Sequence, residues 1–266
     1  MTSTMPTNDL TEAMRLALLR ADPKLSRFDP LPRIISHDCF STGHCGWSQL
    51  VGNYENDLDT MLPGYAQHTS AMLSTLPHWD SGSHGGMGSS YALKIATRPR
   101  KGAQNVAIKR HTFRQRGKIR FEIYFTFKPE ATELKLSETD VRSVGFLFDL
   151  QSGDQDDGGQ RVMPHLRFLN ALDGQHVQKW QFKRRTTELK PIGNTNKTLS
   201  HYHLAEMKAL SFRCNDRTFD MSGFESIRIP AMKNLWCMLN FCLFAETDAD
   251  KRAFLYVDSV CISGDF

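Results

Sequence analysis

The stretch KIRFEIYFTFK, residues 118–128, alternates apolar and polar side chains with a period of two. The apolar positions fall on one side of such a segment: Ile119, Phe121, Ile123, Phe125 and Phe127. The other side is polar: Lys118, Arg120, Glu122, Tyr124, Thr126 and Lys128. Because successive side chains of a β-strand point to opposite faces, this pattern predicts a strand with one face in the core and one polar face.

Strand-like runs of this kind recur along the chain. They are YALKIAT (91–97), NVAIKRHTF (105–113), SVGFLFDLQ (143–151), HLRFLNA (165–171), VQKWQFKR (177–184), LSFRCN (210–215), RTFDMSG (217–223), NLWCMLNFCLFAE (234–246) and AFLYVDSVCIS (253–263). Asn215 and Asp216 occupy the position of a tight hairpin, and the loops at 153–160 and 246–252 are acidic or glycine-bearing, which favours antiparallel order. About ten strands and a single helix are typical of a β-sandwich or barrel.

The N-terminal part has a different period. Residues 8–21 carry apolar side chains at helical spacing, and Asp22-Pro23 ends the pattern, so we expect one amphipathic helix. FDPLPRI (28–34) holds two prolines and is expected to be an irregular tether. The predicted division is residues 1–35 for helix and tether and 36–266 for one all-β domain. Residues 184–203 show no period and predict a long surface loop.

Composition excludes two classes of partner. The formal net charge of +4 comes from 33 basic and 29 acidic residues spread along 266 positions, which argues against nucleic-acid binding. No apolar run approaches the roughly 20 residues of a membrane-spanning helix. The N-terminus lacks the pattern of a secretory signal, so a cytoplasmic protein with its six cysteines reduced is expected.

SHDCFSTGHCGWSQL, residues 36–50, first suggests a metal site, because it places His37, Cys39, His44 and Cys45 within nine positions. Structural zinc sites use paired clamps such as C-x2-C, and the two cysteines here are six positions apart with no second clamp following. The same stretch contains an acidic residue, an aromatic residue, two glycines and a tryptophan: Asp38, Phe40, Gly43, Gly46 and Trp47. This second pattern is typical of a strand followed by a turn.

With these residues the chain resembles jelly-roll sandwiches of the concanavalin A-like lectin and glucanase superfamily, closest to uncharacterised bacterial members. The segment 254–262 is similar to the closing strand of those folds, and SSYALKIATRPRKGAQNVAIKR and LSFRCNDRTFDMSG resemble internal segments. The resemblance covers roughly residues 36–264. It implies an antiparallel jelly-roll β-sandwich whose first and last strands pair, and it says little about activity, because a fold hosts many functions.

In such jelly rolls the implied ligand site is a concave sheet face or the adjoining loops. Arg120, Glu122 and Tyr124 follow one another on the polar side of 118–128, about 7 Å apart. A cation, a carboxylate and a phenol suit a saccharide, whose hydroxyls need donors and acceptors and whose ring packs on an aromatic side chain. A cross-strand salt bridge on a solvated face explains the same residues.

Other candidates lie on neighbouring segments. His165 and Arg167 share one side of a predicted strand, and the loop HWDSGSHGGMGSS (78–90) combines Trp79, Asp80 and His84 with glycines that let a ligand approach the backbone. A flexible hairpin tip explains the glycines equally well. These side chains are the predicted ligand-binding set, with the sheet row beside them.

An enzymatic role stays open at this point. The E-x-D-x-x-E motif of the retaining glucanases on this fold is absent, whereas a polysaccharide lyase or another glycoside hydrolase remains chemically consistent. The predicted catalytic set has Tyr124 or His165 as base, Arg120 or Arg167 as the charge-neutralising group, and Glu122 beside them.

The resemblance also implies a structural calcium near the joined first and last strands, with Asp38 and Asp258 at the matching positions. Both aspartates are equally suited to accept turn amides. No other cofactor is expected.

The sequence therefore predicts a carbohydrate-recognising or carbohydrate-processing protein, with a saccharide as partner and no nucleic acid or membrane. The alternative is a non-catalytic interaction protein that self-associates through the helix or the 184–203 loop. Neither the sugar nor the oligomeric state follows from the sequence.

Overall fold

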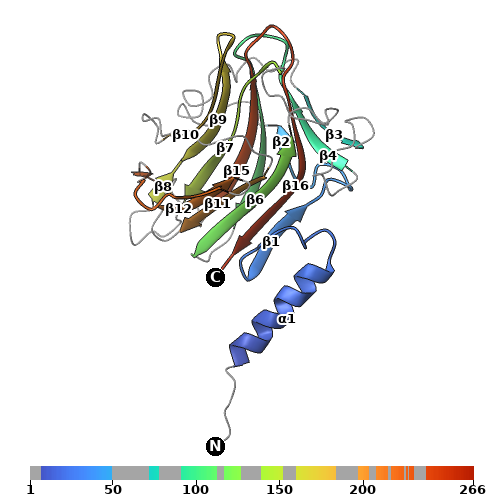
Figure 1. Ribbon diagram of the computed structural model, residues 1–266, viewed down its shortest axis with the longest axis vertical. Coiled ribbons are helices and arrows are strands. Elements are labelled where there is room, and N and C mark those ends of the chain that lie inside the picture. The colour runs from blue at the N-terminus through green and yellow to red at the C-terminus, as the bar shows by residue number, and fades with distance from the viewer. Residues whose placement is uncertain are drawn as a thin grey trace, which may run out of the picture.

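The computed structural model describes residues 7–49, 72–77, 91–112, 117–126, 139–151, 160–183, 197–203, 208–214, 217–224, 226, 228–230 and 238–266. These residues form one helix and sixteen β-strands, and the strand pairs among them are all antiparallel. The strands make two sheets that pack face to face (Figure 1). The protein is an antiparallel jelly-roll β-sandwich with an N-terminal helix, as the sequence predicts.

Sheet A has the strand order β13-β12-β11-β6-β16-β4-β3. The strand β16 has a third partner, β1, in addition to β6 and β4. Its strands are β1 (Arg33–Asp38), β3 (Met72–Pro77), β4 (Tyr91–Ala96), β6 (Lys118–Thr126), β11 (Lys197–His203), β12 (Lys208–Cys214), β13 (Arg217–Asp220) and β16 (Phe254–Gly264). The alternating stretch that opens the sequence argument is β6, near the middle of this sheet.

Sheet B has the order β10-β9-β7-β15-β5-β2, with β8 and β14 attached beyond one end of β7. Its strands are β2 (Ser48–Gln49), β5 (Gln104–Thr112), β7 (Val141–Gln151), β8 (Gln160–Val162), β9 (His165–Leu172), β10 (Gln175–Lys183), β14 (Arg228–Pro230) and β15 (Met238–Thr247). The central strands β7 and β15 are long and almost continuously apolar.

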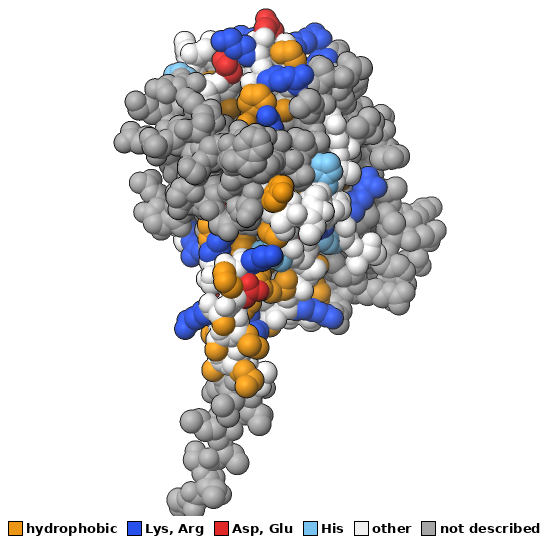
Figure 2. Space-filling model, turned by 90° about the vertical axis from the view of Figure 1, so that its right-hand side faces the viewer, with side chains coloured by type: hydrophobic (Ala, Val, Ile, Leu, Met, Phe, Trp, Pro, Cys, Tyr) orange, Lys and Arg blue, Asp and Glu red, His pale blue; other side chains and the backbone are white. Residues whose placement is uncertain are grey.

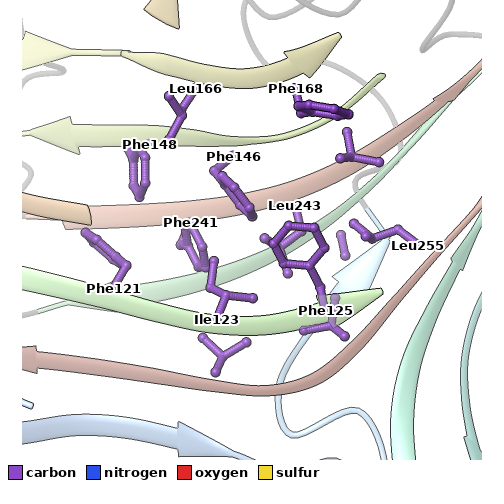
Figure 3. Packing of buried hydrophobic residues seen from close by; sticks show 14 of the residues in the cluster. Phe121, Ile123, Phe125, Phe146, Phe148, Leu166, Phe168, Phe241, Leu243 and Leu255 are labelled. Carbon is purple, nitrogen blue, oxygen red and sulfur yellow. The ribbon is translucent and has the colours of Figure 1, made fainter. Parts of the chain in front are cut away.

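Aromatic rings from both sheets fill the space between them (Figure 3). Phe121 of sheet A lies 4.7 Å from Phe148 and 5.0 Å from Phe241 of sheet B, measured between ring centroids. Ring pairs at this spacing add to the burial of apolar surface that drives folding. The apolar side of the predicted 118–128 strand is therefore the core side over its described residues, 118–126.

The first and last strands join the sandwich as predicted, because β1 pairs with β16 from Arg33↔Gly264 to Asp38↔Val260. The turn after β1 uses Gly43 and Gly46, whose φ angles of 102° and 83° lie in the left-handed region that glycine tolerates. Phe40 and Trp47 on either side of this turn are buried. This part of the opening motif is structural.

The region before β1 differs from the expectation. The helix α1 (Thr7–Ala21) ends before Asp22-Pro23 as predicted, but none of residues 11–21 is buried, and the helix points away from the sandwich (Figure 1). The irregular tether is shorter than predicted. Its last two residues, Arg33 and Ile34, already belong to β1, because a strand can begin directly after Pro32.

The loop predicted at 184–203 is also corrected, since residues 197–203 form β11 in the interior of sheet A, paired with β6 and β12. A strand set by its two neighbours needs no strong pattern of its own. The strands β2, β8 and β14 have only two or three residues, too few for a visible period. The predicted hairpin is confirmed by the pairing Cys214↔Arg217. Within the described residues no helix is long and apolar enough to cross a membrane.

Candidate ligand-binding face

The outer face of sheet B differs from an ordinary solvated sheet surface, because it carries an apolar cluster and buried, hydrogen-bonded polar groups. On β7, Phe146 and Phe148 point into the core, so Leu147 and Asp149 lie on the opposite face. The same alternation holds on β15, where Phe241 and its two-residue neighbours face the core. The outer face is therefore defined residue by residue from the pairing of β5, β15, β7 and β9.

An apolar strip runs along the middle of this face. Its five side chains form a cluster separate from the main core, and each is at most 5% exposed: Val106, Ile108, Leu147, Cys242 and Phe244. Burial raises the pKa of the Cys242 thiol, which makes it an unreactive packing group. The strip is therefore an apolar cluster on the outer side of sheet B that is covered and not open to solvent.

A hydrogen-bonded polar group lies at one end of the strip. Arg161 donates to Asp149 through Nε at 2.7 Å and through Nη2 at 3.0 Å, and Asn240 Nδ2 donates to Asp149 Oδ2 at 2.8 Å. All three residues are at most 8% exposed. The amide oxygen of Asn240 is buried with no hydrogen-bond partner, so a strong acceptor beside the apolar strip stays unused.

The other end of the strip has a similar composition. Glu246 accepts a hydrogen bond from Ser143 at 2.6 Å and lies 3.4 Å from Arg142, and it pairs in register with Gln104. The Gln104 Oε1 atom is likewise buried without a hydrogen-bond partner. From Asn240 to Glu246 the strand advances about 20 Å, so the two unused acceptors frame an extended strip.

Two of the predicted site residues lie along this strip. His165 is buried and packs edge-on against Phe244, with ring centroids 4.8 Å apart. Arg167 is half-buried and donates two hydrogen bonds to Gln181 Oε1, at 3.2 and 2.8 Å. The structure therefore brings these two together with the Asp149 group, at neighbouring register positions of β9, β7 and β15.

The predicted row Arg120, Glu122 and Tyr124 lies on the opposite side of the molecule, on the outer face of sheet A. There it contacts residues 27–31, the segment that leads into β1. Tyr124 donates to the Arg27 carbonyl at 2.7 Å, and the Asp29 amide donates to the Glu122 carboxylate at 2.9 and 3.1 Å. The four predicted catalytic positions are thus divided between two faces, His165 on one and the other three on the other.

The predicted calcium ligands each have a cation beside them. Lys109 Nζ lies 2.7 Å from both carboxylate oxygens of Asp38, and Trp47 donates to the same carboxylate at 2.9 Å. Asp258 is fully buried and paired with Arg27. Within the described chain, which includes both aspartates and the cysteine and histidine cluster at 37–45, no three potential metal ligands converge.

The loop candidates Trp79, Asp80 and His84 lie outside the described residues. Asp149 and Arg161 were missed from the sequence, although a signal existed. Asp149 and Asn240 are polar residues inside otherwise apolar runs, GFLFDLQ and MLNFCLF. A polar side chain there marks the face that does not enter the core, and Arg161 follows in an adjoining short strand that has no period.

The sequence matches the model of a family described as "Domain of unknown function (DUF6772)" over residues 15–207 and 203–266. No curated protein matches it.

Among solved structures it is similar to three carbohydrate-related proteins. "Cellulose induced protein, Cip1" is 10% identical, with 86% of this chain and 96% of that chain covered and a TM-score of 0.45. The Emp47p carbohydrate recognition domain is 9% identical, with 90% and 100% covered and a TM-score of 0.41. The CBM22-1 xylan-binding domain of Paenibacillus barcinonensis Xyn10C is 9% identical, with 89% and 97% covered and a TM-score of 0.36. Because each TM-score is below 0.5, these similarities assign neither a ligand nor a superfamily to this chain.

Proposed function

The chain belongs to the family described as "Domain of unknown function (DUF6772)", and since that description assigns no ligand, we propose from the geometry alone that the protein binds a saccharide on the outer face of sheet B. The observation that carries the proposal is the buried, unused amide oxygen of Asn240 beside the Asp149–Arg161 pair and the apolar strip. Ligand sites are apolar surfaces with a few placed polar groups.

The chemistry of the strip fits a sugar better than a purely charged ligand. The strip and both acceptor atoms are buried, so a sugar reaches them only when this face opens. The apolar face of its ring then packs on the strip, and its hydroxyls donate to Asn240 Oδ1 and Gln104 Oε1. The described residues at the rim add donors, with Arg110 exposed and Arg167 half-buried. Asp149 is already held by Arg161 and Asn240, so its role is to fix the orientation of the Asn240 amide.

A saccharide panel read by thermal shift, followed by titration calorimetry on any hit, tests the proposal. We expect at least one oligosaccharide to raise Tm, and Asn240→Ala to weaken its binding at least tenfold, because a hydrogen bond at a buried acceptor is lost. His176→Ala, an exposed position near the end of β10, is the matched control and is expected to bind unchanged. A silent panel, or equal affinities for both variants, would contradict the proposal.

A second candidate function is self-association through α1. Met14 and Leu18 are 70% and 68% exposed, and Figure 2 shows hydrophobic side chains on the surface of the helix where it extends from the sandwich. A 15-residue helix is marginally stable in water when, as over residues 11–21, none of its described side chains is buried, so pairing with α1 of a second copy would stabilise it. Light scattering of the full chain tests this assembly.

A further inference from the structure

A short segment that follows the helix is bound along its backbone by side chains of sheet A. Residues 27–31 cross the outer face of this sheet, and we call them the strap. Both carboxylate oxygens of Glu122 accept the Asp29 amide, Tyr124 donates to the carbonyl of Arg27 at 2.7 Å, and the Leu31 amide donates to Ser263 Oγ at 2.9 Å. The sheet therefore binds the backbone of a segment that leaves a turn at Arg27, where the Phe28 amide donates to the Leu25 carbonyl at 2.9 Å.

The side chains of the strap are recognised as well. The Arg27 guanidinium hydrogen-bonds to Asp258 and to Ser259, and it lies over the Tyr124 ring, 3.8 Å from the centroid. The Arg27 side chain is 19% exposed, and this burial lowers the pKa of its guanidinium. This subsite combines a buried carboxylate with an aromatic face, the two features that hold a guanidinium.

The next two strap residues fill two further subsites. Phe28 packs edge-on against Tyr124 and against His37, with centroids 5.3 Å apart in both pairs. Asp29 pairs with Arg120 at 2.6 Å. Each strap side chain thus meets a complementary partner: Arg27 meets a carboxylate, Phe28 meets aromatic rings and Asp29 meets a guanidinium. The face is therefore complementary to an Arg-aromatic-Asp sequence.

The strap is held by few buried side chains. Between residues 11 and 32 the buried residues are Phe28 and Pro30, whereas the sheet residues Glu122, Asp258 and Cys261 beneath are 0% exposed. Segments with few buried apolar contacts open at a lower free energy than the core to which they are attached. Release of the strap would uncover a formed face without unfolding the sandwich.

We propose that the outer face of sheet A is a binding site for a peptide segment of the type Arg-aromatic-Asp, and that residues 27–29 fill it in cis. The site is on the opposite side of the sandwich from the saccharide strip and is independent of it. A partner peptide competes with the strap, so its apparent affinity is reduced by the fraction of molecules in which the strap is bound.

Cys261 provides a reporter for strap release. It pairs in register with Glu122 on β6 and with His37 on β1, and it alternates with the core residues Val260 and Ile262, so its thiol lies on the strap side of the sheet. The residue is fully buried. The rate at which a maleimide labels Cys261, located by mass spectrometry, therefore measures opening.

The experiment uses the full chain and a fluorescent peptide with the sequence of residues 24–32, KLSRFDPLP. The variant Arg27→Ala/Phe28→Ala weakens the strap and leaves the sheet residues intact. We expect it to label at Cys261 at least tenfold faster than the unmodified protein and to bind the peptide at least tenfold more tightly. The matched controls are Arg20→Ala on the exposed surface of α1, expected to behave as unmodified protein, and a peptide with alanine at both positions, expected not to bind.

Two results would overturn the proposal. If Cys261 labels faster but the peptide binds neither protein, the face packs the strap without being a recognition site. If the peptide binds both proteins equally, the strap does not compete for the site. Circular dichroism confirms that the double variant is folded, and if it is not, Phe28→Leu is used with the same two readouts and the same two criteria.

Discussion

His111 on β5 shows how much of the behaviour of one residue depends on its surroundings. Its Nε2 atom is buried without a hydrogen-bond partner, and its pKa is lowered to about 4, first by burial and second by the charge of Lys109, with Asp38 acting in the opposite direction. Folding therefore keeps this imidazole neutral at pH values where it is protonated in the unfolded chain.

The consequence for stability has a definite sign. Because the pKa in the folded state lies below the unfolded value near 6.5, the folded protein binds fewer protons between pH 6.5 and 4. Stability from this group is complete above pH 6.5 and is lost as the pH falls toward 4. Allowing for its partial exposure, we expect His111→Asn to remove on the order of 1 to 2 kcal/mol of the stability lost between pH 7 and 4.5.

Urea unfolding at several pH values measures this effect. The unmodified protein and the variant are compared at each pH, and His176→Asn, at an exposed position, is the control. Parallel stability curves for the unmodified protein and His111→Asn would show that this imidazole does not contribute to the pH dependence.

At the scale of elements, the packing of β7 against β9 depends on one missing side chain. A Cβ atom at Gly145 would lie 2.4 Å from the Leu166 carbonyl oxygen and 2.8 Å from the Phe244 ring. Backbone on one side and a buried ring on the other leave no room to adjust. With any other residue at this position, the Leu166 backbone or the Phe244 ring of the apolar strip has to shift.

Gly145→Ala is expected to destabilise the protein by about 1–3 kcal/mol, because overpacking shifts either the strand or the Phe244 ring. Gly223→Ala is the control, since a Cβ there meets nothing within 4 Å, and we expect it to change stability by less than about 0.5 kcal/mol. Urea unfolding of both variants gives the comparison. Equal stabilities would mean that the strip tolerates displacement of Phe244.

Strands differ in how clearly their local sequence pattern predicts them. β6 reads directly from alternation, because one of its faces is core and the other polar. β11 has no such alternation, because its place in the sheet is set by pairing with two neighbours, β6 and β12. These two strands are more than 60 positions apart in the chain. A one-sided pattern reports burial of a face, and pairing partners leave no trace in local sequence.

At the scale of the whole molecule, α1 stands apart from the sandwich, and its exposed apolar side chains suggest assembly (Figure 2). If α1 pairs with a second copy, Met14→Glu/Leu18→Glu should convert a dimer to a monomer, because two charges would be buried in the contact. Multi-angle light scattering at several micromolar concentrations measures the mass. Arg20→Ala is the control, and a monomer in all proteins would exclude self-association through the helix.

At this scale the candidate residues also fall into two groups, one on each outer face of the sandwich. Residue type alone grouped Arg120, Glu122 and Tyr124 with His165 and Arg167, since all are polar positions on strands. The sandwich has two outer faces, and a strand's place in sheet A or sheet B decides on which face its polar side chains lie. The first three meet the strap and the last two flank the apolar strip.

The sequence by itself determined a β-sandwich or barrel class, the helix and most of the longer strands, because these depend on local periodicity and turn residues. The jelly-roll form and the pairing of the first strand with the last were implied by the resemblance that the short motifs carry. Only the tertiary structure decided that Arg27–Leu31 covers the row on β6, that Asp149, Arg161 and Asn240 form one hydrogen-bonded group, and that two candidate sites lie on opposite faces. Such contacts join segments as far apart as residues 31 and 263, and local sequence carries no information about which distant segment will lie beside it.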